Sequence, residues 1–142
     1  MTTILDAKDM KLGRFASILA KRLLMGEKIV VVNAEQAVIV GSRDNIFSEY
    51  KEMHDKGHRY TGPFFPKVPH LIFKRTVRGM LPKQNKRGKE ALGRLIVHIG
   101  VPDNLKELKI ESLPECKVSP EKQKFVRLGE VSRHLGWTPK IS

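Results

Sequence analysis

The chain of 142 residues is long enough for one hydrophobic core, and we expect a single domain over residues 1–142. It carries 27 Lys and Arg against 15 Asp and Glu, a formal charge of +12, which predicts a polyanionic partner. The single cysteine, Cys116, excludes an intramolecular disulfide, and no apolar run is long enough to span a bilayer, so we expect a cytoplasmic protein.

The first forty residues alternate between strand and helix patterns. Residues 2–6 have the composition of a short strand, and residues 14–25 repeat apolar side chains every three or four positions, which predicts a helix that Gly26 ends. The apolar run 29–32 predicts a strand covered on both faces, and the run 37–40 predicts another strand. This order favours an α/β fold with a mainly parallel sheet.

The next segment changes from helix to loop. An apolar stripe behind the N-cap residue Ser42 predicts a helix near 43–56. Residues 57–69 hold two glycines and three prolines, which predicts an extended loop. Phe64 and Phe65 in this loop either stack on bases or fix the loop to the protein itself.

A second set of elements follows the loop. Residues 70–81 predict a helix with an apolar edge and a cationic face, which Pro82 ends. Residues 83–89 predict a polar basic turn, and residues 90–95 a short helix.

The last third of the chain contains fewer regular patterns. Residues 95–99 predict a strand, and residues 103–124 a largely irregular connection. The spacing of apolar residues over 128–135 predicts a last short helix with Gly136 as its C-cap.

The positive charge is concentrated in residues 56–94, which we call the basic module. It contains eleven basic residues and one acid, Glu90, a net charge of +10, whereas the other 103 residues carry 16 basic and 14 acidic side chains. A solvated charged face ordinarily mixes both signs, so the near exclusion of acids predicts an anionic partner, with nucleic acid the first choice.

Arginines bind phosphates as two-pronged donors and lysines as point charges. Gly79 and Gly88 either allow the backbone to approach RNA closely or serve as turn glycines. The residues that we expect to bind RNA are Arg14, Lys56, His58, Arg59, Lys67, Lys74, Arg75, Arg78, Lys83, Lys86, Arg87, Lys89 and Arg94.

No catalytic or cofactor motif is present in the sequence. It contains no phosphate-binding loop, no dinucleotide-binding glycine motif and no nucleophile elbow. His54 and His58 have a spacing that two zinc ligands use, but the expected helix ends at Gly57, so we expect hydrogen-bonding or cationic histidines. We therefore expect no enzyme, cofactor, metal or small-molecule substrate.

Two stretches resemble signatures of the universal ribosomal protein thirteen family of the large subunit. They run from Leu12-Gly13-Arg14-Phe15-Ala16-Ser17 to Ala34-Glu35, and from Arg75-Thr76-Val77-Arg78-Gly79-Met80-Leu81-Pro82 to Lys86-Arg87-Gly88-Lys89-Glu90-Ala91-Leu92. The segment Gly62-Pro63-Phe64-Phe65-Pro66 resembles the archaeal and eukaryotic branch, and the chain length is similar to the archaeal members.

This resemblance implies a three-layer α/β/α fold around a four-stranded, mainly parallel sheet. It implies binding to large-subunit ribosomal RNA (rRNA), contact with neighbouring ribosomal proteins and a role in subunit assembly, without enzymatic activity or a cofactor.

Other functions are compatible with parts of the pattern. A free regulatory protein that binds messenger RNA would use the same basic face. A nucleotide-using enzyme on a Rossmann-like sheet conflicts with the missing phosphate loop. A membrane-surface protein conflicts with the short basic helix and its neighbouring glycines and prolines.

Overall fold

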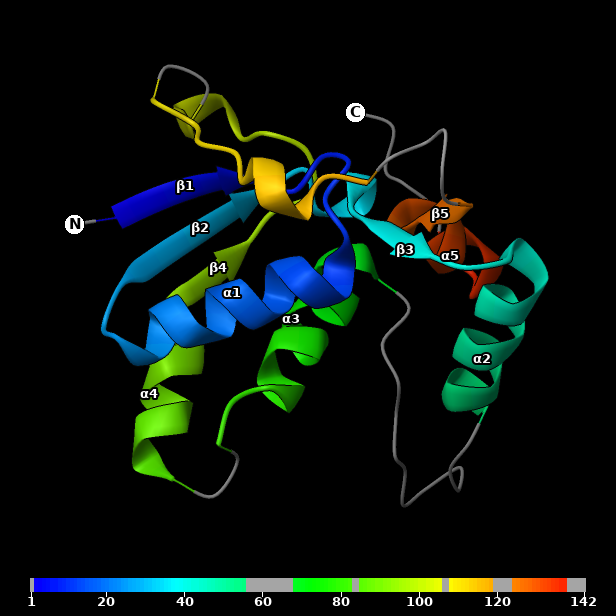
Figure 1. The fold of residues 1–142 in the computed structure, drawn as a ribbon, viewed down its shortest axis with the longest axis horizontal. Coiled ribbons are helices and arrows are strands. Elements are labelled where there is room, and N and C mark those ends of the chain that lie inside the picture. Colours follow the sequence, from blue (N-terminus) through cyan, green and yellow to red (C-terminus); the bar gives the residue numbers. More distant parts are fainter. Residues whose placement is uncertain (1, 56–67, 83–84, 106–107, 119–123, 138–142) are drawn as a thin grey trace.

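The computed structural model describes residues 2–55, 68–82, 85–105, 108–118 and 124–137 (Figure 1). The order of strands and helices confirms the predicted α/β class. The elements are β1 (Thr2–Asp6), α1 (Leu12–Leu24), β2 (Lys28–Val32), β3 (Val38–Val40), α2 (Arg43–Asp55), α3 (Pro69–Gly79), α4 (Lys86–Gly93), β4 (Leu95–Val97), β5 (Phe125–Arg127) and α5 (Leu128–His134), with short 3-10 helices at Ala34–Gln36, Asp103–Leu105 and Pro114–Cys116.

The central sheet is parallel and has the strand order β1-β2-β4 in the described residues. Strand β2 lies in the middle, so Val30 pairs with Ile4 on one side and with Ile96 on the other. Alternate residues of β2 point to opposite faces: Val31 packs under the helices and Val30 packs on the other side. The prediction of a strand covered on both faces is therefore confirmed.

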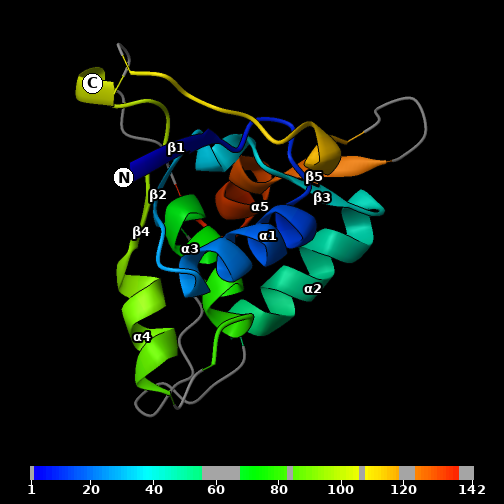
Figure 2. The same cartoon turned by 60° about the vertical axis from the view of Figure 1, so that its left-hand side comes forward.

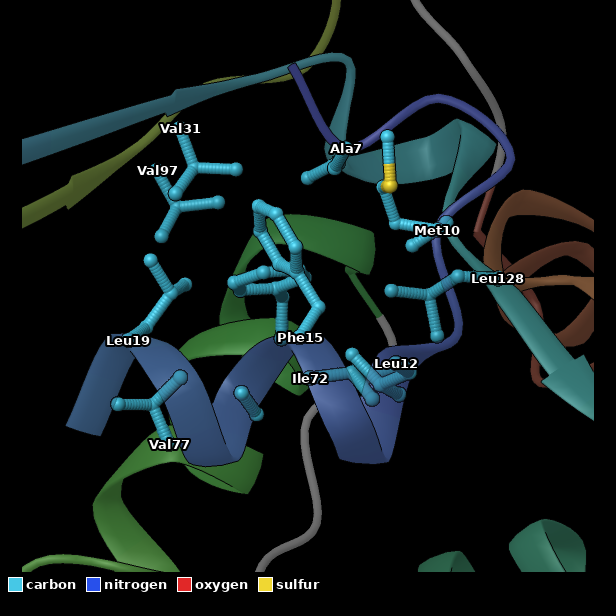
Figure 3. Packing of buried hydrophobic residues seen from close by; sticks show 14 of the residues in the cluster. Ala7, Met10, Leu12, Phe15, Leu19, Val31, Ile72, Val77, Val97 and Leu128 are labelled. Atoms are coloured by element: carbon cyan, nitrogen blue, oxygen red, sulfur yellow. The ribbon is translucent and has the colours of Figure 1, made fainter. Parts of the chain in front are cut away.

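Helices α1 and α3 lie on one face of this sheet, and α4 contacts α1 and leads into the start of β4 (Figures 1 and 2). Phe15 of α1 and Phe73 of α3 are fully buried, and their rings meet edge to face with centroids 5.8 Å apart. Leu19 and Val77 extend the contact between the two helices. Leu128, at the start of α5, is a buried member of the same core (Figure 3). This packing makes the helices a rigid support for the side chains on their outer surface.

The opposite face of the sheet has a different cover. Val30 and Val32 pack there against Val101, Leu105 and Ile110 from an irregular segment. In the described part of the chain, helices thus lie on one face of the sheet and a mostly irregular segment on the other. The three-layer arrangement implied by the resemblance is not seen in full.

The predicted strand over 37–40 does not join the parallel sheet. Strand β3 instead pairs antiparallel with β5, which the sequence analysis missed. The reason is chain length: a parallel neighbour of β2 needs a crossover of about a dozen residues, and only residues 33–37 separate β2 from β3. The parallel sheet therefore has three strands, not four, among the described residues.

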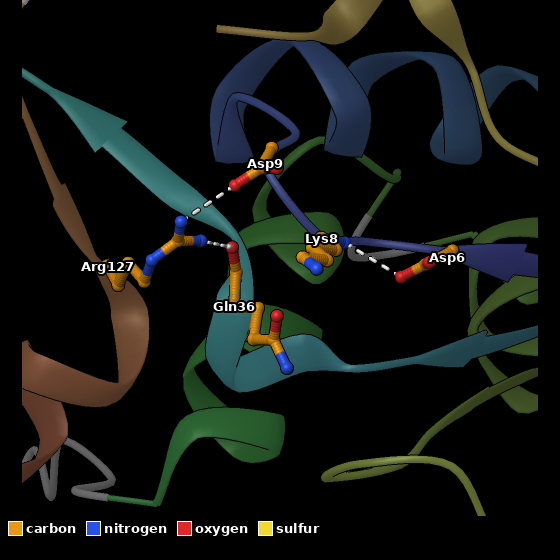
Figure 4. A network of polar contacts seen from close by, with 5 residues as sticks. All are labelled: Asp6, Lys8, Asp9, Gln36 and Arg127. Carbon is orange, nitrogen blue, oxygen red and sulfur yellow. Dashed lines mark hydrogen bonds and ion pairs between the residues drawn. The ribbon is translucent and has the colours of Figure 1, made fainter. Parts of the chain in front are cut away.

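Polar contacts hold β5 against the body of the protein (Figure 4). The Arg127 guanidinium lies 2.8 Å from an Asp9 carboxylate oxygen, and it also donates to the Gln36 carbonyl at 3.0 Å. Nearby, the Lys8 backbone N–H donates to the Asp6 carboxylate at 2.9 Å, which orders the turn after β1. The β3–β5 pair is thus attached to the loop between β1 and α1.

The boundaries around α3 and α4 differ from the prediction. Helix α3 ends at Gly79 instead of residue 81, and β4 ends at Val97 instead of residue 99. Helix α4 begins at Lys86, inside the segment predicted to be a turn. The low helix propensity of Gly88 argues against a helix there, but Gly88 is buried and tertiary packing outweighs the propensity.

Candidate nucleic-acid interface

Helices α1, α3 and α4 carry the predicted RNA-binding residues that the structure describes. Lys74, Arg75 and Arg78 lie on α3, Lys86, Arg87 and Lys89 lie on α4, Arg94 follows α4, and Arg14 lies on α1. Of the remaining predicted residues, Lys56, His58, Arg59, Lys67 and Lys83 lie outside the described residues.

Two arginines join the α4 region to the end of α1. Arg94 donates to the Leu23 carbonyl at 2.6 Å, and Arg87 donates to the Leu24 carbonyl at 3.2 Å. Carbonyls in the last turn of a helix lack intrahelical partners, and the negative end of the helix dipole favours cations there. Arg87 and Arg94 therefore stabilise the end of α1, a role that the sequence analysis did not predict.

This role leaves both arginines able to contact an external anion. A guanidinium has five N–H donors, and each of these hydrogen bonds uses one of them. Arg87 is exposed and Arg94 is half-buried. Their position at the end of α1 is thus compatible with a phosphate contact.

The other basic side chains on α3 and α4 differ in exposure. Arg78, Lys86 and Lys89 are exposed, whereas Lys74 and Arg75 are half-buried. The one acid of the basic module, Glu90, lies 3.9 Å from the Lys86 ammonium, whose side chain is 90% exposed. Such an exposed pair contributes little to stability, so the Lys86 charge remains available to an anion.

The two glycines of the basic module have different surroundings. A Cβ atom at Gly88 would overlap the Pro82 carbonyl, so Gly88 is required for the packing of α4 against the end of α3. Gly79 is exposed and a Cβ there would meet nothing within 4 Å. Close approach of RNA to the backbone stays a prediction for Gly79. At Gly88 the close neighbour is the Pro82 carbonyl of the same chain.

Arg14 lies apart from the α4 cations. It is exposed near the start of α1, about 14 Å along the helix axis from Leu23. It lines a separate groove with β3, Tyr50 of α2 and Thr76 of α3. The structure therefore does not bring Arg14 together with Arg87 and Arg94.

A histidine that the sequence analysis missed lies on the same helix as Lys74. Burial lowers the pKa of His70, and the nearby His98 and Lys74 lower it further. His70 is therefore neutral at pH 7 and adds no charge to the surface. The sequence offers one signal for this: His70 and Lys74 are four residues apart in the predicted helix, a spacing that places the two side chains close together.

The described residues show no arrangement for metal or thiol chemistry. Among them, no three His, Cys, Asp or Glu side chains are grouped so that they could hold a metal ion. Burial, together with the nearby Glu115, raises the pKa of the Cys116 thiol, which keeps it protonated and inert. In the part of the chain described, no helix is long and apolar enough to cross a membrane.

Sequence comparisons identify the family. Residues 1–104 match the model described as Ribosomal protein L13. The large ribosomal subunit protein uL13 of Archaeoglobus fulgidus is 51% identical over 138 residues, which cover 95% of this chain and 88% of the relative. Proteins with the same name from the archaea Methanococcoides burtonii and Methanosarcina barkeri are 45% and 46% identical, covering 94% of this chain and 97% of each relative. The chain therefore belongs to the ribosomal protein L13 family, in agreement with the resemblance seen in its motifs.

Proposed function

We propose that this protein is a structural constituent of the large ribosomal subunit that binds large-subunit rRNA and supports subunit assembly. The observation that carries the proposal is the exposed, nearly acid-free surface of α3 and α4, with Arg78, Lys86 and Lys89 on helices held by a rigid core. The names of the archaeal relatives point to the same subunit.

The basic residues divide into two kinds of phosphate ligand. The arginines bind phosphate oxygens in pairs, and the lysines neutralise charge without a fixed geometry. Phosphate contacts of this kind position RNA and make binding dependent on salt. The proposed ligands are Arg14, Lys56, His58, Arg59, Lys67, Lys74, Arg75, Arg78, Lys83, Lys86, Arg87, Lys89 and Arg94.

The proposed role is structural, not catalytic. The family to which the chain belongs consists of ribosomal proteins, whose work is binding and assembly in the ribosome of the cytoplasm. Neighbouring large-subunit proteins are the expected protein partners. No cofactor or small-molecule substrate enters this proposal.

We also propose that the sheet gains a fourth parallel position beside β1. Glu111 forms a parallel bridge with Leu5. Its backbone N–H donates to the Ile4 carbonyl at 2.9 Å, and its carbonyl accepts from the Asp6 N–H at the same distance. A fourth strand here, with helices on a second face, would give the three-layer arrangement that the family resemblance implies.

Co-sedimentation tests the proposed function against the messenger RNA alternative, which would use the same basic surface. The tagged full chain is expressed in an archaeal host, and lysate is separated on a sucrose gradient at physiological salt. We expect the chain in the large-subunit and ribosome fractions, and with the large subunit after low magnesium splits the ribosome. A chain found at the top of the gradient, or with messenger RNA free of subunits, would contradict the proposal.

A further inference from the structure

A groove lies between the end of α3 and α4, inside the basic surface. It has a volume of about 260 Å³ and is lined by Arg78, Leu81, Pro82, Gly88, Lys89 and Leu92. This volume is below the ~300–1,000 Å³ typical of sites for whole small molecules. The groove therefore has room for a flat group of the size of one base.

The groove is built into the packing of the two helices. Because Gly88 has no side chain, α4 lies directly against the Pro82 carbonyl. The hydrogen bonds from Arg87 and Arg94 to the last turn of α1 attach α4 at both of its ends. The walls of the groove are thus positioned by contacts that do not depend on a ligand.

The lining of the groove combines apolar and cationic side chains. Leu81, Pro82 and Leu92 supply the apolar part of the lining, and the two cations of the lining, Arg78 and Lys89, are exposed. A nucleotide has the complementary pattern, since its base has flat, largely apolar faces and its phosphates are anionic. Proteins recognise RNA in this way when bases are unstacked and placed against side chains.

We propose that this groove binds one unstacked nucleotide of the RNA, with its base against Leu81, Pro82 and Leu92 and its phosphates at Arg78 and Lys89. A paired and stacked base cannot enter, so the groove selects a loop or bulge over a regular duplex. The inference deepens the proposed function and rests on it, because it takes the occupant to be the same RNA that the basic surface binds.

The substitution Leu92→Lys separates a base pocket from a purely electrostatic surface. It adds a positive charge and replaces one of the three apolar side chains that line the groove. If the groove contacts phosphates alone, the added charge tightens binding to purified large-subunit rRNA. If it holds a base, binding weakens by about 5- to 150-fold, the range that corresponds to burying part or all of one leucine side chain against the base.

The matched control is Ile96→Lys, which adds the same charge on the opposite face of the sheet. Ile96 is 51% exposed and pairs with Val30 away from the helices. We expect its affinity to stay within about twofold of the wild type. Thermal melting followed by circular dichroism checks that both variants fold.

Chemical probing of the RNA gives a second readout that does not depend on affinity. Purified large-subunit rRNA is saturated with wild-type protein or with Leu92→Lys, and dimethyl sulfate then marks accessible bases. We expect at least one unpaired base that the wild type protects and the variant leaves reactive, while the hydroxyl-radical footprint of the backbone is the same for both.

The outcomes separate this inference from the proposed function. If the wild type does not bind rRNA in a salt-dependent manner, the proposed function fails and the inference with it. If the wild type binds but Leu92→Lys binds more tightly, or gives the same base protections, the groove does not hold a base and the proposed function stands.

Discussion

At the scale of single residues, two glycines nine positions apart have different surroundings in the structure. Both were candidates for close approach to RNA, and the sequence pattern did not distinguish them. The difference lies in tertiary contacts, since Gly88 is packed against the Pro82 carbonyl and Gly79 faces open space. A local pattern of residues contains no information about which backbone segment lies opposite.

Alanine at each of these glycines tests this difference. We expect Gly88→Ala to lower the free energy of unfolding by about 1–3 kcal/mol, because the new methyl group overlaps a backbone carbonyl. Gly79→Ala raises the free energy of unfolding by at most about 1 kcal/mol. Alanine has less backbone freedom than glycine in the unfolded chain, so the variant loses less entropy when it folds. Urea unfolding of the two proteins measures both values, and equal stability would contradict the packing role of Gly88.

His70 gives a second prediction at this scale. Burial lowers its folded-state pKa below the ordinary value of 6.5, so the unfolded chain takes up this proton more readily as the pH falls. The contribution of His70 to stability is therefore present above pH 6.5 and is lost as the pH falls below it. His70→Gln removes this contribution to the pH dependence. The measurement is the difference between the urea midpoints at pH 7.5 and pH 5.5, for the wild type and for His70→Gln. The same difference in both proteins would contradict a lowered pKa of His70.

At the scale of elements, the helix and strand patterns were informative wherever one face of the element is buried. The helix at α1 and the strand at β2 follow directly from apolar periodicity, and both lie within two residues of their predicted limits. Predictions failed where chain geometry or contacts distant in sequence determine the pairing of a strand or the start of a helix. The pairing of β3 with β5 depends on the short link after β2, and the start of α4 depends on the fit of Gly88.

The join between α4 and α1 was the least predictable part of the candidate site. Arg87 and Arg94 have the residue type expected of phosphate ligands, but their hydrogen-bond partners in the structure are carbonyls more than sixty residues away in the chain. The charge pattern could identify them as cations of the basic module. It could not reveal that they also attach one helix to another.

Substitution by methionine tests this join, because it keeps the length of the side chain and removes the donors. We expect Arg94→Met to lower the free energy of unfolding by about 1–3 kcal/mol, since the Leu23 carbonyl loses a charged donor in a half-buried position. The matched control is Lys86→Met, whose side chain is 90% exposed, with an expected change within about 0.5 kcal/mol. Equal effects of the two changes in urea unfolding would show that Arg94 has no structural role.

At the scale of the whole molecule, the charge is divided between a nearly neutral body and one basic module. Core residues from both parts hold α1, α3 and α4 together. The exposed described cations of the module, Arg78, Lys86, Arg87 and Lys89, lie on α3 and α4. This division is expected of a protein that folds around an apolar core and neutralises RNA phosphates with one surface.

A salt titration of binding to purified large-subunit rRNA tests this account most directly. The wild type is compared with Arg78→Ala/Lys86→Ala/Lys89→Ala on the α3–α4 surface, and with the control Lys109→Ala/Lys117→Ala/Lys124→Ala, which removes three exposed charges elsewhere. We predict that the first triple variant lowers affinity and reduces the slope of log affinity against log salt by about 2–3, whereas the control keeps the wild-type slope. Equal slopes for the two triple variants would contradict the assignment of the RNA-binding surface to α3 and α4.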